Sequence, residues 1–134
     1  MKFMITGGAG FIGNTLIRYI IKNTSFDVIN VDCLTYAGNL DSLQDVDSNA
    51  NYTFEKIDIC NRNELNKLFK KYRPDIIMHL AAESHVDRSI DSPLRFLETN
   101  IIGTFNLLDE SKNYYHQLDS VQKKRFKFHH ISTD

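Results

Sequence analysis

The sequence has only two cysteines, and their placement argues against the usual cysteine-based sites. Cys33 and Cys60 are too far apart for a C-x-x-C motif and no second pair exists, so we expect neither a zinc site nor a redox motif. Reduced thiols, as in cytosolic proteins, are the default interpretation. The histidines also lack metal-ligand spacing and are interpreted as packing or hydrogen-bonding residues: His79, His85, His129 and His130.

The sequence also lacks a strong charge of either sign and a long hydrophobic run. Its formal net charge is −1, and its basic residues are spread out apart from Lys123-Lys124-Arg125, which we interpret as a solvated approach to a strand. No nucleic acid or membrane partner is therefore expected, although charge alone excludes neither. No run approaches a membrane span, and the apolar stretch after Lys2 is cut by glycine at position 7, unlike a signal peptide. We predict a soluble, cytoplasmic protein.

The composition that remains is that of an ordinary globular protein, with 42% hydrophobic and 25% charged residues in a chain of 134. A chain of this length can bury one hydrophobic core, and nothing in the sequence suggests two. We therefore treat residues 1–134 as a single domain.

The most informative segment is a glycine-rich turn at residues 7–13, which follows an apolar strand. The glycines fit two overlapping registers, G-x-G-x-x-G on Gly8, Gly10 and Gly13, and G-x-x-G-x-x-G on Gly7, Gly10 and Gly13. One glycine permits the tight turn, one lets backbone N–H groups approach a pyrophosphate, and one lets the next helix pack close to the strand. That helix directs its unpaired N–H groups at the phosphates. A plain strand-to-helix corner is the alternative.

An acidic residue stands where such a site requires one. A second apolar strand, residues 28–31, ends on Asp32, about twenty residues past Gly13. A carboxylate at this position accepts hydrogen bonds from the adenosine ribose hydroxyls and repels a 2′-phosphate, which favours NAD over NADP. The alternative is a solvated loop carboxylate. Because strand, turn, helix and acid are in register, we predict a site for NAD.

The middle of the chain alternates between strand and helix patterns. A polar stretch at residues 36–51 is predicted to be a loop with one helical turn. Residues 52–57 then alternate as a third strand that ends at Asp58. The pattern Asn61-x-x-Glu64 resembles a helix cap with its reciprocal acid, and it precedes an amphipathic helix.

The remaining pattern completes a parallel sheet. Residues 75–80 form a nearly continuous apolar run, typical of a strand covered on both faces, and residues 126–131 form the fifth strand. Between them Ser92-Pro93 begins a long helix. Its predicted stripe consists of Leu97, Ile101, Thr104, Phe105 and Leu108. Alternating strands and helices with right-handed crossovers predict an α/β fold with a doubly wound parallel sheet, whose ligands gather at the carboxyl ends of the strands.

The segments at those strand ends together resemble the dTDP-glucose 4,6-dehydratase family of the extended short-chain dehydrogenase/reductases. The glycine motif is shared across that whole group, whereas L-T-Y-A-G-N at residues 34–39 and A-A-E-S-H-V-D-R-S at residues 81–89 are far more specific. The H-H-I-S-T-D segment at residues 129–134 completes the set. The resemblance covers the entire chain and implies an NAD-binding Rossmann fold.

The resemblance also implies an activity and a set of site residues. Such an enzyme holds NAD, oxidises C4 of dTDP-glucose, eliminates water across C5 and C6, and returns the hydride to C6; the full-length enzyme is expected to be a homodimer. Around NAD, besides the four glycines, it places Phe11, Ile12, Asp32, Cys33, Leu34, Thr35, Asp58, Ile59, Leu80, Ala81, Ala82 and Thr99. Ser84 and Thr133 are placed at the sugar, and the catalytic pair is Thr133 with Asp134, the acid that protonates the departing hydroxyl.

Several of these residues have plainer alternative roles. Ala81 and Ala82 are also what tight helix packing requires after a strand. Periodicity alone makes Thr99 a helix-surface hydroxyl. The segment 132–134 would pass as a turn or helix cap in isolation.

The sequence departs from the family pattern at its end. The family carries a glutamate, the C5 base, directly after Ser-Thr-Asp, and further on a Tyr-x-x-x-Lys pair that takes the C4 hydroxyl proton. Tyr72 and Tyr114 are not followed by lysine four residues later, so we expect no internal substitute. The chain is thus predicted to be the cofactor half of such an enzyme, truncated after the fifth strand, with the C-terminal substrate-binding part absent. An apolar sheet edge is expected to result.

Three functions remain open from the sequence. The first is the cofactor half of a sugar-nucleotide dehydratase, inactive by itself. The second is a relative of the NAD-dependent sugar-nucleotide epimerases or decarboxylases, and the third is a non-catalytic NAD-binding remnant.

Overall fold

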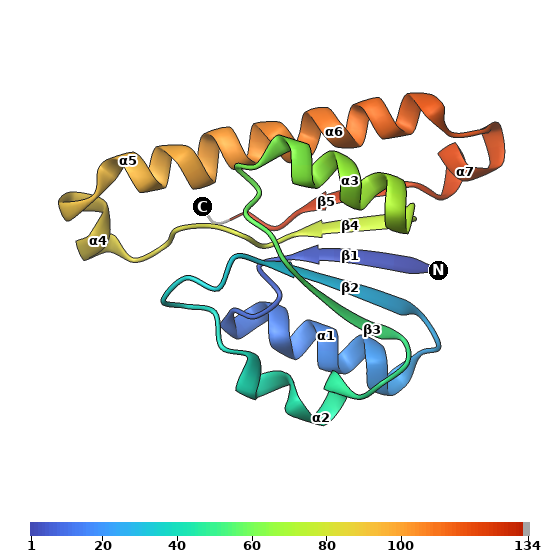
Figure 1. Ribbon diagram of the computed structural model, residues 1–134, viewed down its shortest axis with the longest axis horizontal. Helices are drawn as coiled ribbons and strands as arrows, with labels where there is room; N and C mark the ends of the chain where they lie inside the picture. The colour runs from blue at the N-terminus through green and yellow to red at the C-terminus, as the bar shows by residue number, and fades with distance from the viewer. Residues whose placement is uncertain (133–134) are drawn as a thin grey trace.

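The chain folds around one parallel β-sheet (Figure 1). The computed structural model describes residues 1–132. Within them the sheet has five strands in the order β3-β2-β1-β4-β5, and every neighbouring pair is parallel. The strands are β1 (Lys2–Thr6), β2 (Asp27–Asp32), β3 (Tyr52–Lys56), β4 (Ile76–His79) and β5 (Lys127–His130). This order confirms the predicted doubly wound sheet.

Helices cover both faces of the sheet (Figure 1). One face carries α1 (Phe11–Asn23) and, after the 3-10 helix η1 (Leu40–Leu43), the short α2 (Gln44–Asp47). The other face carries α3 (Arg62–Tyr72) and α6 (Thr104–Gln117). The remaining helices are α4 (Val86–Asp91), α5 (Pro93–Phe96), the π-helix η2 (Leu97–Gly103) and α7 (Ser120–Arg125). Within residues 1–132, no helix has the length and hydropathy needed to cross a membrane.

The central strand β1 contributes to the hydrophobic core on both faces, because successive side chains of a strand point to opposite sides. Met4 is fully buried with Leu65 and Leu107 on the side of α3 and α6. Ile5 is fully buried with Ile17 on the side of α1. The sheet is therefore held between two apolar layers, which fixes the position of its carboxyl edge.

The long helix formed by α5, η2 and α6 begins as predicted, with Ser92 at the N-cap and Pro93 at the first position. Its face toward the sheet, however, is not the predicted one. Four residues of the predicted stripe are 46–57% exposed: Leu97, Ile101, Phe105 and Leu108. The apolar periodicity therefore identified the helix correctly but marks its outer face in this chain.

Small and polar residues form the inner face of this helix. A Cβ atom at Gly103 would lie 2.6 Å from the Ile59 side chain, so only glycine allows this close approach. One helical turn further, Leu107 is fully buried, and Asn106 is buried beside it. The sheet-facing side is therefore set by close packing at Gly103 together with burial of Leu107 in the core.

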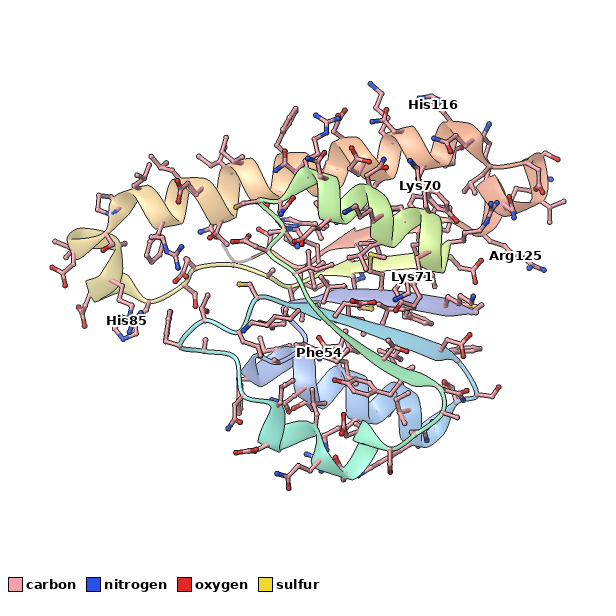
Figure 2. The ribbon with its side chains drawn as sticks, viewed as in Figure 1. Phe54, Lys70, Lys71, His85, His116 and Arg125 are labelled. Atoms are coloured by element: carbon pink, nitrogen blue, oxygen red, sulfur yellow. The ribbon has the colours of Figure 1, made fainter. Side chains whose placement is uncertain are left out.

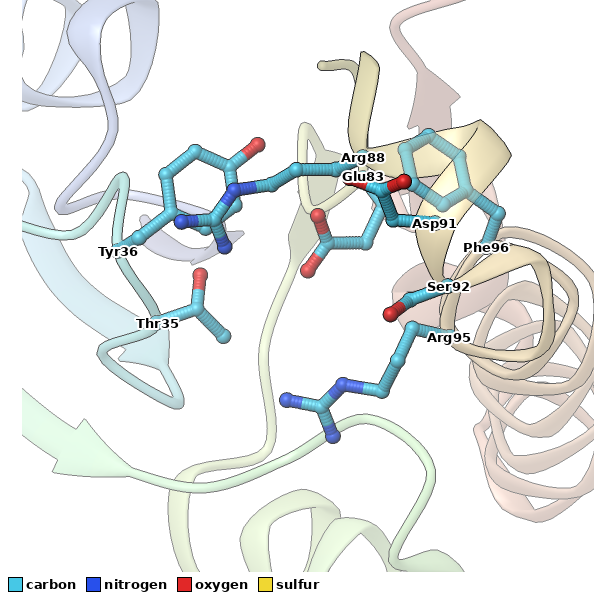
Figure 3. Close-up of a pocket in the computed structure, with 8 residues that line it drawn as sticks. All are labelled: Thr35, Tyr36, Glu83, Arg88, Asp91, Ser92, Arg95 and Phe96. Atoms are coloured by element: carbon cyan, nitrogen blue, oxygen red, sulfur yellow. The ribbon is translucent and has the colours of Figure 1, made fainter. Parts of the chain in front are cut away.

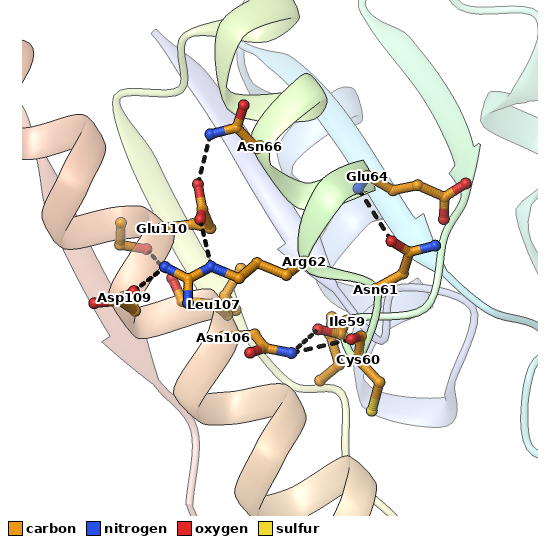
Figure 4. A network of polar contacts seen from close by, with 11 residues as sticks. Ile59, Cys60, Asn61, Arg62, Glu64, Asn66, Asn106, Leu107, Asp109 and Glu110 are labelled. Carbon is orange, nitrogen blue, oxygen red and sulfur yellow. Dashed lines mark hydrogen bonds and ion pairs between the residues drawn. The ribbon is translucent and has the colours of Figure 1, made fainter.

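A polar network joins α3 to α6 (Figure 4). The Arg62 guanidinium donates through Nε to Glu110 at 2.9 Å and also pairs with Asp109. The other Glu110 carboxylate oxygen accepts from Asn66 at 2.8 Å. Because Glu110 is only 5% exposed, these partners compensate for the loss of solvent around its charge. The network fixes the helix that borders the carboxyl edge.

Lys123 and its basic neighbours lie on helix α7, which Asp119 and Gln122 begin with a capping box and which leads into β5. Two local predictions need correction. The Asn61 side chain accepts from the Glu64 amide, but the reciprocal bond from Glu64 is not formed. The exposed edge strand β5 is less apolar than expected, since Phe128 is its one apolar residue.

Candidate functional site

The carboxyl ends of all five strands lie at one edge of the sheet (Figure 1). The segments that follow β1, β2, β3 and β4 therefore assemble there, as the sequence predicted. Figure 2 shows His85 near this edge, whereas Lys70, Lys71 and Arg125 lie toward the opposite end of the molecule. The labelled cations of α3 and α7 thus do not face the predicted ligand region.

The glycine turn after β1 leaves no space for side chains at three of its four glycines. Gly7 has a positive φ of 73° and its added Cβ would lie 2.6 Å from the Ala81 nitrogen. A Cβ at Gly13 would lie 2.2 Å from the Gly7 carbonyl oxygen. A Cβ at Gly8 would lie 2.1 Å from the amide oxygen of Asn30, a buried oxygen without a partner among the described residues. These glycines are needed by the fold itself.

Gly10 differs from the other three. A Cβ at this position would meet one atom, the Gly7 carbonyl oxygen at 3.3 Å, a close contact but a milder one than at the other three glycines. Gly10 is also the N-cap of α1 and provides no side-chain cap. The absence of a side chain at this helix N-terminus fits the approach of a pyrophosphate to backbone amides. Phe11 and Ile12, which follow, have side chains that are 88% and 64% exposed.

Asp32 joins the end of β2 to the glycine turn. One carboxylate oxygen accepts from the Ala9 amide at 3.0 Å, and the other accepts from the Leu34 amide at 2.8 Å. The loop returns to the same place, because the Asn39 amide donates to the Ala9 carbonyl at 3.0 Å. The predicted ribose acid therefore lies beside the predicted phosphate-binding turn.

The loop after Asp32 is held in an unusual backbone conformation. Leu34 has a φ of 57°, in the left-handed region that residues with side chains rarely adopt. The amide of Gly38 donates to the Thr35 carbonyl at 3.0 Å, which closes a turn behind it. Cys33 and Thr35 are half-buried on either side of Leu34. The fold thus presents this loop in one defined shape at the site.

The segment after β3 is fixed by α6 (Figure 4). The Asn106 side chain donates to the carbonyls of Cys60, at 3.0 Å, and Ile59, at 3.4 Å. The Asp58 carboxylate accepts from the Cys60 amide at 2.8 Å. Ile59 is 4% exposed and packs in the core, so its side chain is structural and only its backbone is available to a ligand.

The two thiols of the site are not activated. Burial, followed by the charge of Asp58, raises the pKa of Cys60 to about 11. Burial and the Asp58 and Asp32 carboxylates also raise the pKa of Cys33. Both groups are therefore protonated near neutral pH. Among residues 1–132, no group of three or more His, Cys, Asp or Glu side chains could hold a metal ion.

A hydrogen-bonded chain crosses the sheet just below the site. The Thr6 hydroxyl accepts from the Ala81 amide at 3.4 Å and is hydrogen-bonded to Nδ1 of His79 at 2.7 Å. Nε2 of His79 is hydrogen-bonded to the Thr104 hydroxyl at 2.9 Å, so both ring nitrogens have partners. Burial and the neighbouring His130 lower the pKa of His79 to about 4. His79 thus serves hydrogen bonding, as the sequence predicted.

The segment after β4 carries the small residues that could leave room for a ligand. Leu80 and Ala81 are half-buried, and Ala82 and Ser84 are exposed. Thr99 is half-buried on η2. These positions are consistent with the predicted roles, which the geometry alone does not assign.

Sequence reasoning missed Asn100, which holds this segment in place. Its side chain accepts from the Glu83 amide at 2.8 Å and donates to the Glu83 carbonyl at 2.9 Å. This pairing anchors the backbone next to Ser84 to the helix that carries Thr99. The available signal was the polar and small series Asn100, Gly103 and Thr104 at helical spacing, opposite the apolar stripe.

Thr133 and Asp134 lie outside the described residues. A Tyr-x-x-x-Lys spacing that the sequence reasoning passed over does occur, from Tyr52 to Lys56. It lies on strand β3, where four residues span about 13 Å. Tyr52 is buried and its hydroxyl accepts from Asn30 at 3.0 Å, so the two side chains do not form a catalytic pair.

The doubly wound sheet, the glycine turn and the acid at the end of β2 define a Rossmann-type nucleotide-binding domain. Residues 4–134 match the family model described as GDP-mannose 4,6 dehydratase. The chain therefore belongs to this family. The side-chain-free helix N-terminus at Gly10 and the position of Asp32 fit a dinucleotide.

Individual relatives support the same family assignment. The chain is 59% identical to a dTDP-glucose 4,6-dehydratase of Neisseria meningitidis over 99% of its length, but spans only 38% of that protein. It superposes on the dTDP-glucose 4,6-dehydratase of Bacillus anthracis, solved in complex with NAD, with a TM-score of 0.82 and 33% identity, covering 99% of this chain and 37% of that one. The UDP-glucose 4-epimerase of Thermotoga maritima, solved with UDP-glucose, gives a TM-score of 0.76 and 37% identity over 85% of this chain and 35% of that one.

Proposed function

We propose that this chain binds NAD and forms the cofactor-binding part of an enzyme that dehydrates dTDP-glucose to its 4-keto-6-deoxy product. The observation that carries the proposal is the meeting of the glycine turn with Asp32, which are joined by a 3.0 Å hydrogen bond from the Ala9 amide. The 59% identity to a dTDP-glucose 4,6-dehydratase favours this substrate over the UDP-glucose of the epimerase relative.

In this proposal each segment at the carboxyl edge of the sheet has a separate role. The amides of the glycine turn and the N-terminus of α1 hold the pyrophosphate, because Gly10 places no side chain at the N-cap of that helix. Asp32 accepts from the adenosine ribose hydroxyls and repels a 2′-phosphate. Ala81 and Ala82 leave room beside the cofactor. Bound NAD supplies a group that accepts a hydride and later returns it.

The sugar would lie beside the segment after β4. Ser84 is exposed there, next to the Glu83 backbone that Asn100 anchors. Thr133 is proposed to bind the sugar as well, and Asp134 to protonate the departing C6 hydroxyl. Removal of that hydroxyl as free hydroxide is unfavourable, and a positioned general acid contributes about 10²–10⁴-fold to the rate.

The 134-residue chain by itself is proposed to be inactive in dehydration. The oxidation at C4 requires a group that accepts the hydroxyl proton, and the one Tyr-x-x-x-Lys spacing lies on a strand, with Tyr52 buried. Burial raises the pKa of Tyr52, which makes it still less able to act as a base. The chain spans 38% of the Neisseria relative, so the remaining groups are expected from the rest of such a protein.

The experiment that tests this proposal combines cofactor binding with product analysis. The full-length protein is titrated with NAD and NADP and then incubated with dTDP-glucose, UDP-glucose or GDP-mannose. Preferential NAD binding and a 4-keto-6-deoxy product from dTDP-glucose support the proposal. Epimerisation of UDP-glucose would instead support an epimerase. NAD binding without any turnover would support a non-catalytic remnant, and 4-keto-6-deoxy product from the purified 134-residue chain would overturn its proposed inactivity.

We also propose that a second copy covers the outer stripe of η2 and α6 in the full-length enzyme. Leu97, Ile101 and Phe105 are each more than half exposed, and a continuous apolar stripe of this kind marks an interaction surface. Ile101→Glu is expected to shift sedimentation from dimer to monomer. Tyr19→Glu, at a 65% exposed residue on α1, serves as the control. A monomer before substitution would contradict the proposal.

A further inference from the structure

The aromatic ring of Tyr36 is held between two residues of a different segment. The Arg88 guanidinium lies over the Tyr36 ring, 3.7 Å from its centre. Figure 3 shows the two side chains together. The His85 ring meets the same tyrosine edge-on, at 6.2 Å between ring centres. Among the described residues, Arg88 has no carboxylate within ion-pair distance, so the ring face is its principal partner.

The two partners of this contact come from opposite walls of the site. Tyr36 follows Thr35 in the loop that begins at Asp32 and is joined to the glycine turn. Arg88 lies on α4, which begins just after Ser84 and the anchored Glu83 backbone. The contact therefore links the cofactor-side loop after β2 to the substrate-side segment after β4.

A cavity of about 450 Å³ lies beside this link (Figure 3). Thr35 and Tyr36 line one side, and Glu83, Arg88 and Arg95 line the other. Arg95 faces the cavity from α5 but does not stack on the tyrosine. The Arg88–Tyr36 contact thus lies at one side of a space lined by Thr35, from the loop that begins at the predicted ribose acid.

We infer that Arg88 and Tyr36 form a latch across the nucleotide site that slows release of the cofactor. This inference rests on the proposed function, in which a hydride removed from C4 must return to C6 of the same sugar. An enzyme that released its reduced cofactor between these steps would leave the sugar oxidised. A contact that joins the two walls must open before the loop at Asp32 can move away, so it delays that release.

The strength of the contact sets the size of the effect. Both Tyr36, at 46% exposed, and Arg88 are solvent-exposed, and a cation–π contact at such a site corresponds to about a two- to fivefold change in an equilibrium or rate. Arg88 and Tyr36 act as positioning residues here, because neither needs to touch the reacting atoms.

The test measures release of NADH from the full-length protein by stopped-flow fluorescence, with excess NAD as the displacing ligand. Arg88→Ala and Tyr36→Ala are each expected to accelerate release about two- to fivefold, and the double variant no more than either single one. Tyr36→Phe keeps the ring and Arg88→Lys keeps a cation, so both should retain slow release. Arg95→Ala removes the same charge from the same cavity without removing the stack and is the matched control. Melting temperatures establish that each variant is folded.

The possible results separate the latch from its alternatives. Additive effects of the two alanine substitutions, or an Arg95→Ala effect equal to that of Arg88→Ala, would show a general electrostatic role and overturn the latch. Normal NADH binding with unchanged release in Arg88→Ala and Tyr36→Ala would overturn the latch alone. Failure of the unsubstituted protein to bind NAD or NADH would overturn the proposed function and the latch together.

Discussion

The Asp32 carboxylate and the Ala9 amide are joined by a 3.0 Å hydrogen bond that connects the end of the second strand to the turn after the first. The second carboxylate oxygen of Asp32 is bonded to the Leu34 amide at 2.8 Å. One side chain thus orders both backbone segments that are expected to touch a dinucleotide. Its ligand-binding role and its structural role are consequently linked.

Substitution of Asp32 should separate these roles. Asp32→Ala is expected to weaken NAD binding about tenfold or more and to narrow the preference over NADP, since the ribose acceptor and the repulsion of a 2′-phosphate are both lost. Asp32→Asn retains one acceptor oxygen but removes the charge. It should therefore narrow the preference for NAD over NADP while it destabilises the fold less than Asp32→Ala does. Titration of both cofactors and thermal unfolding measure the two effects. Unchanged NAD affinity in Asp32→Ala would contradict the assignment.

An added methyl group should affect mainly NAD affinity at Gly10 and mainly the stability of the fold at Gly13. Gly10→Ala is expected to weaken NAD binding about tenfold while it costs about 1 kcal/mol of stability or less, because its Cβ would meet the Gly7 carbonyl oxygen at 3.3 Å, a contact that a small shift relieves. Gly13→Ala should cost about 1–3 kcal/mol, because its Cβ would lie 2.2 Å from the Gly7 carbonyl oxygen. Denaturant unfolding and NAD titration of both variants check this. Equal stability losses would show that Gly10 is merely structural.

His79 should make the stability of the protein depend on pH. Its pKa is lowered from 6.5 to about 4 in the folded state, so the unfolded chain binds the extra proton first as the pH falls. The contribution of neutral His79 to the free energy of unfolding is complete above about pH 6.5 and is lost as the pH falls from there to about 4. From about pH 7 to about pH 5 the expected loss is about 2 kcal/mol. Urea unfolding across this range measures it, and His79→Gln should flatten the curve; an unchanged slope would show that other groups are responsible.

Cys60 should react slowly with alkylating reagents. A pKa raised from 9.0 to about 11 reduces the thiolate fraction about 100-fold near neutral pH. Iodoacetamide at about pH 8 should therefore modify Cys60 far more slowly in the folded protein than in urea. Mass spectrometry of Cys60 over time gives the rate, with a Cys33→Ser variant to remove the other thiol. Equal rates in the folded and unfolded protein would contradict a shielded thiol.

The amino-acid sequence by itself determined the class of the fold and the edge of the sheet at which the candidate site lies. Alternation of apolar and helical patterns predicts a parallel sheet, and right-handed crossovers leave few topologies for it. The glycines of residues 7–13 and the acid at Asp32 predict a nucleotide site because backbone conformation and charge at these positions are local requirements. Such requirements can be read from short segments, since they depend on few neighbours.

The tertiary structure decided which faces are buried and which distant groups meet. The stripe through Leu97 and Phe105 faces outward, because Gly103 lets the opposite side of the helix lie directly against Ile59. The distinct role of Gly10 became visible once the space around each glycine was known. The contact of Arg88 with Tyr36 likewise joins segments far apart in the chain. The spacing of apolar residues shows that a helix has an apolar and a polar face. Only the packing of all elements together decides which face is buried.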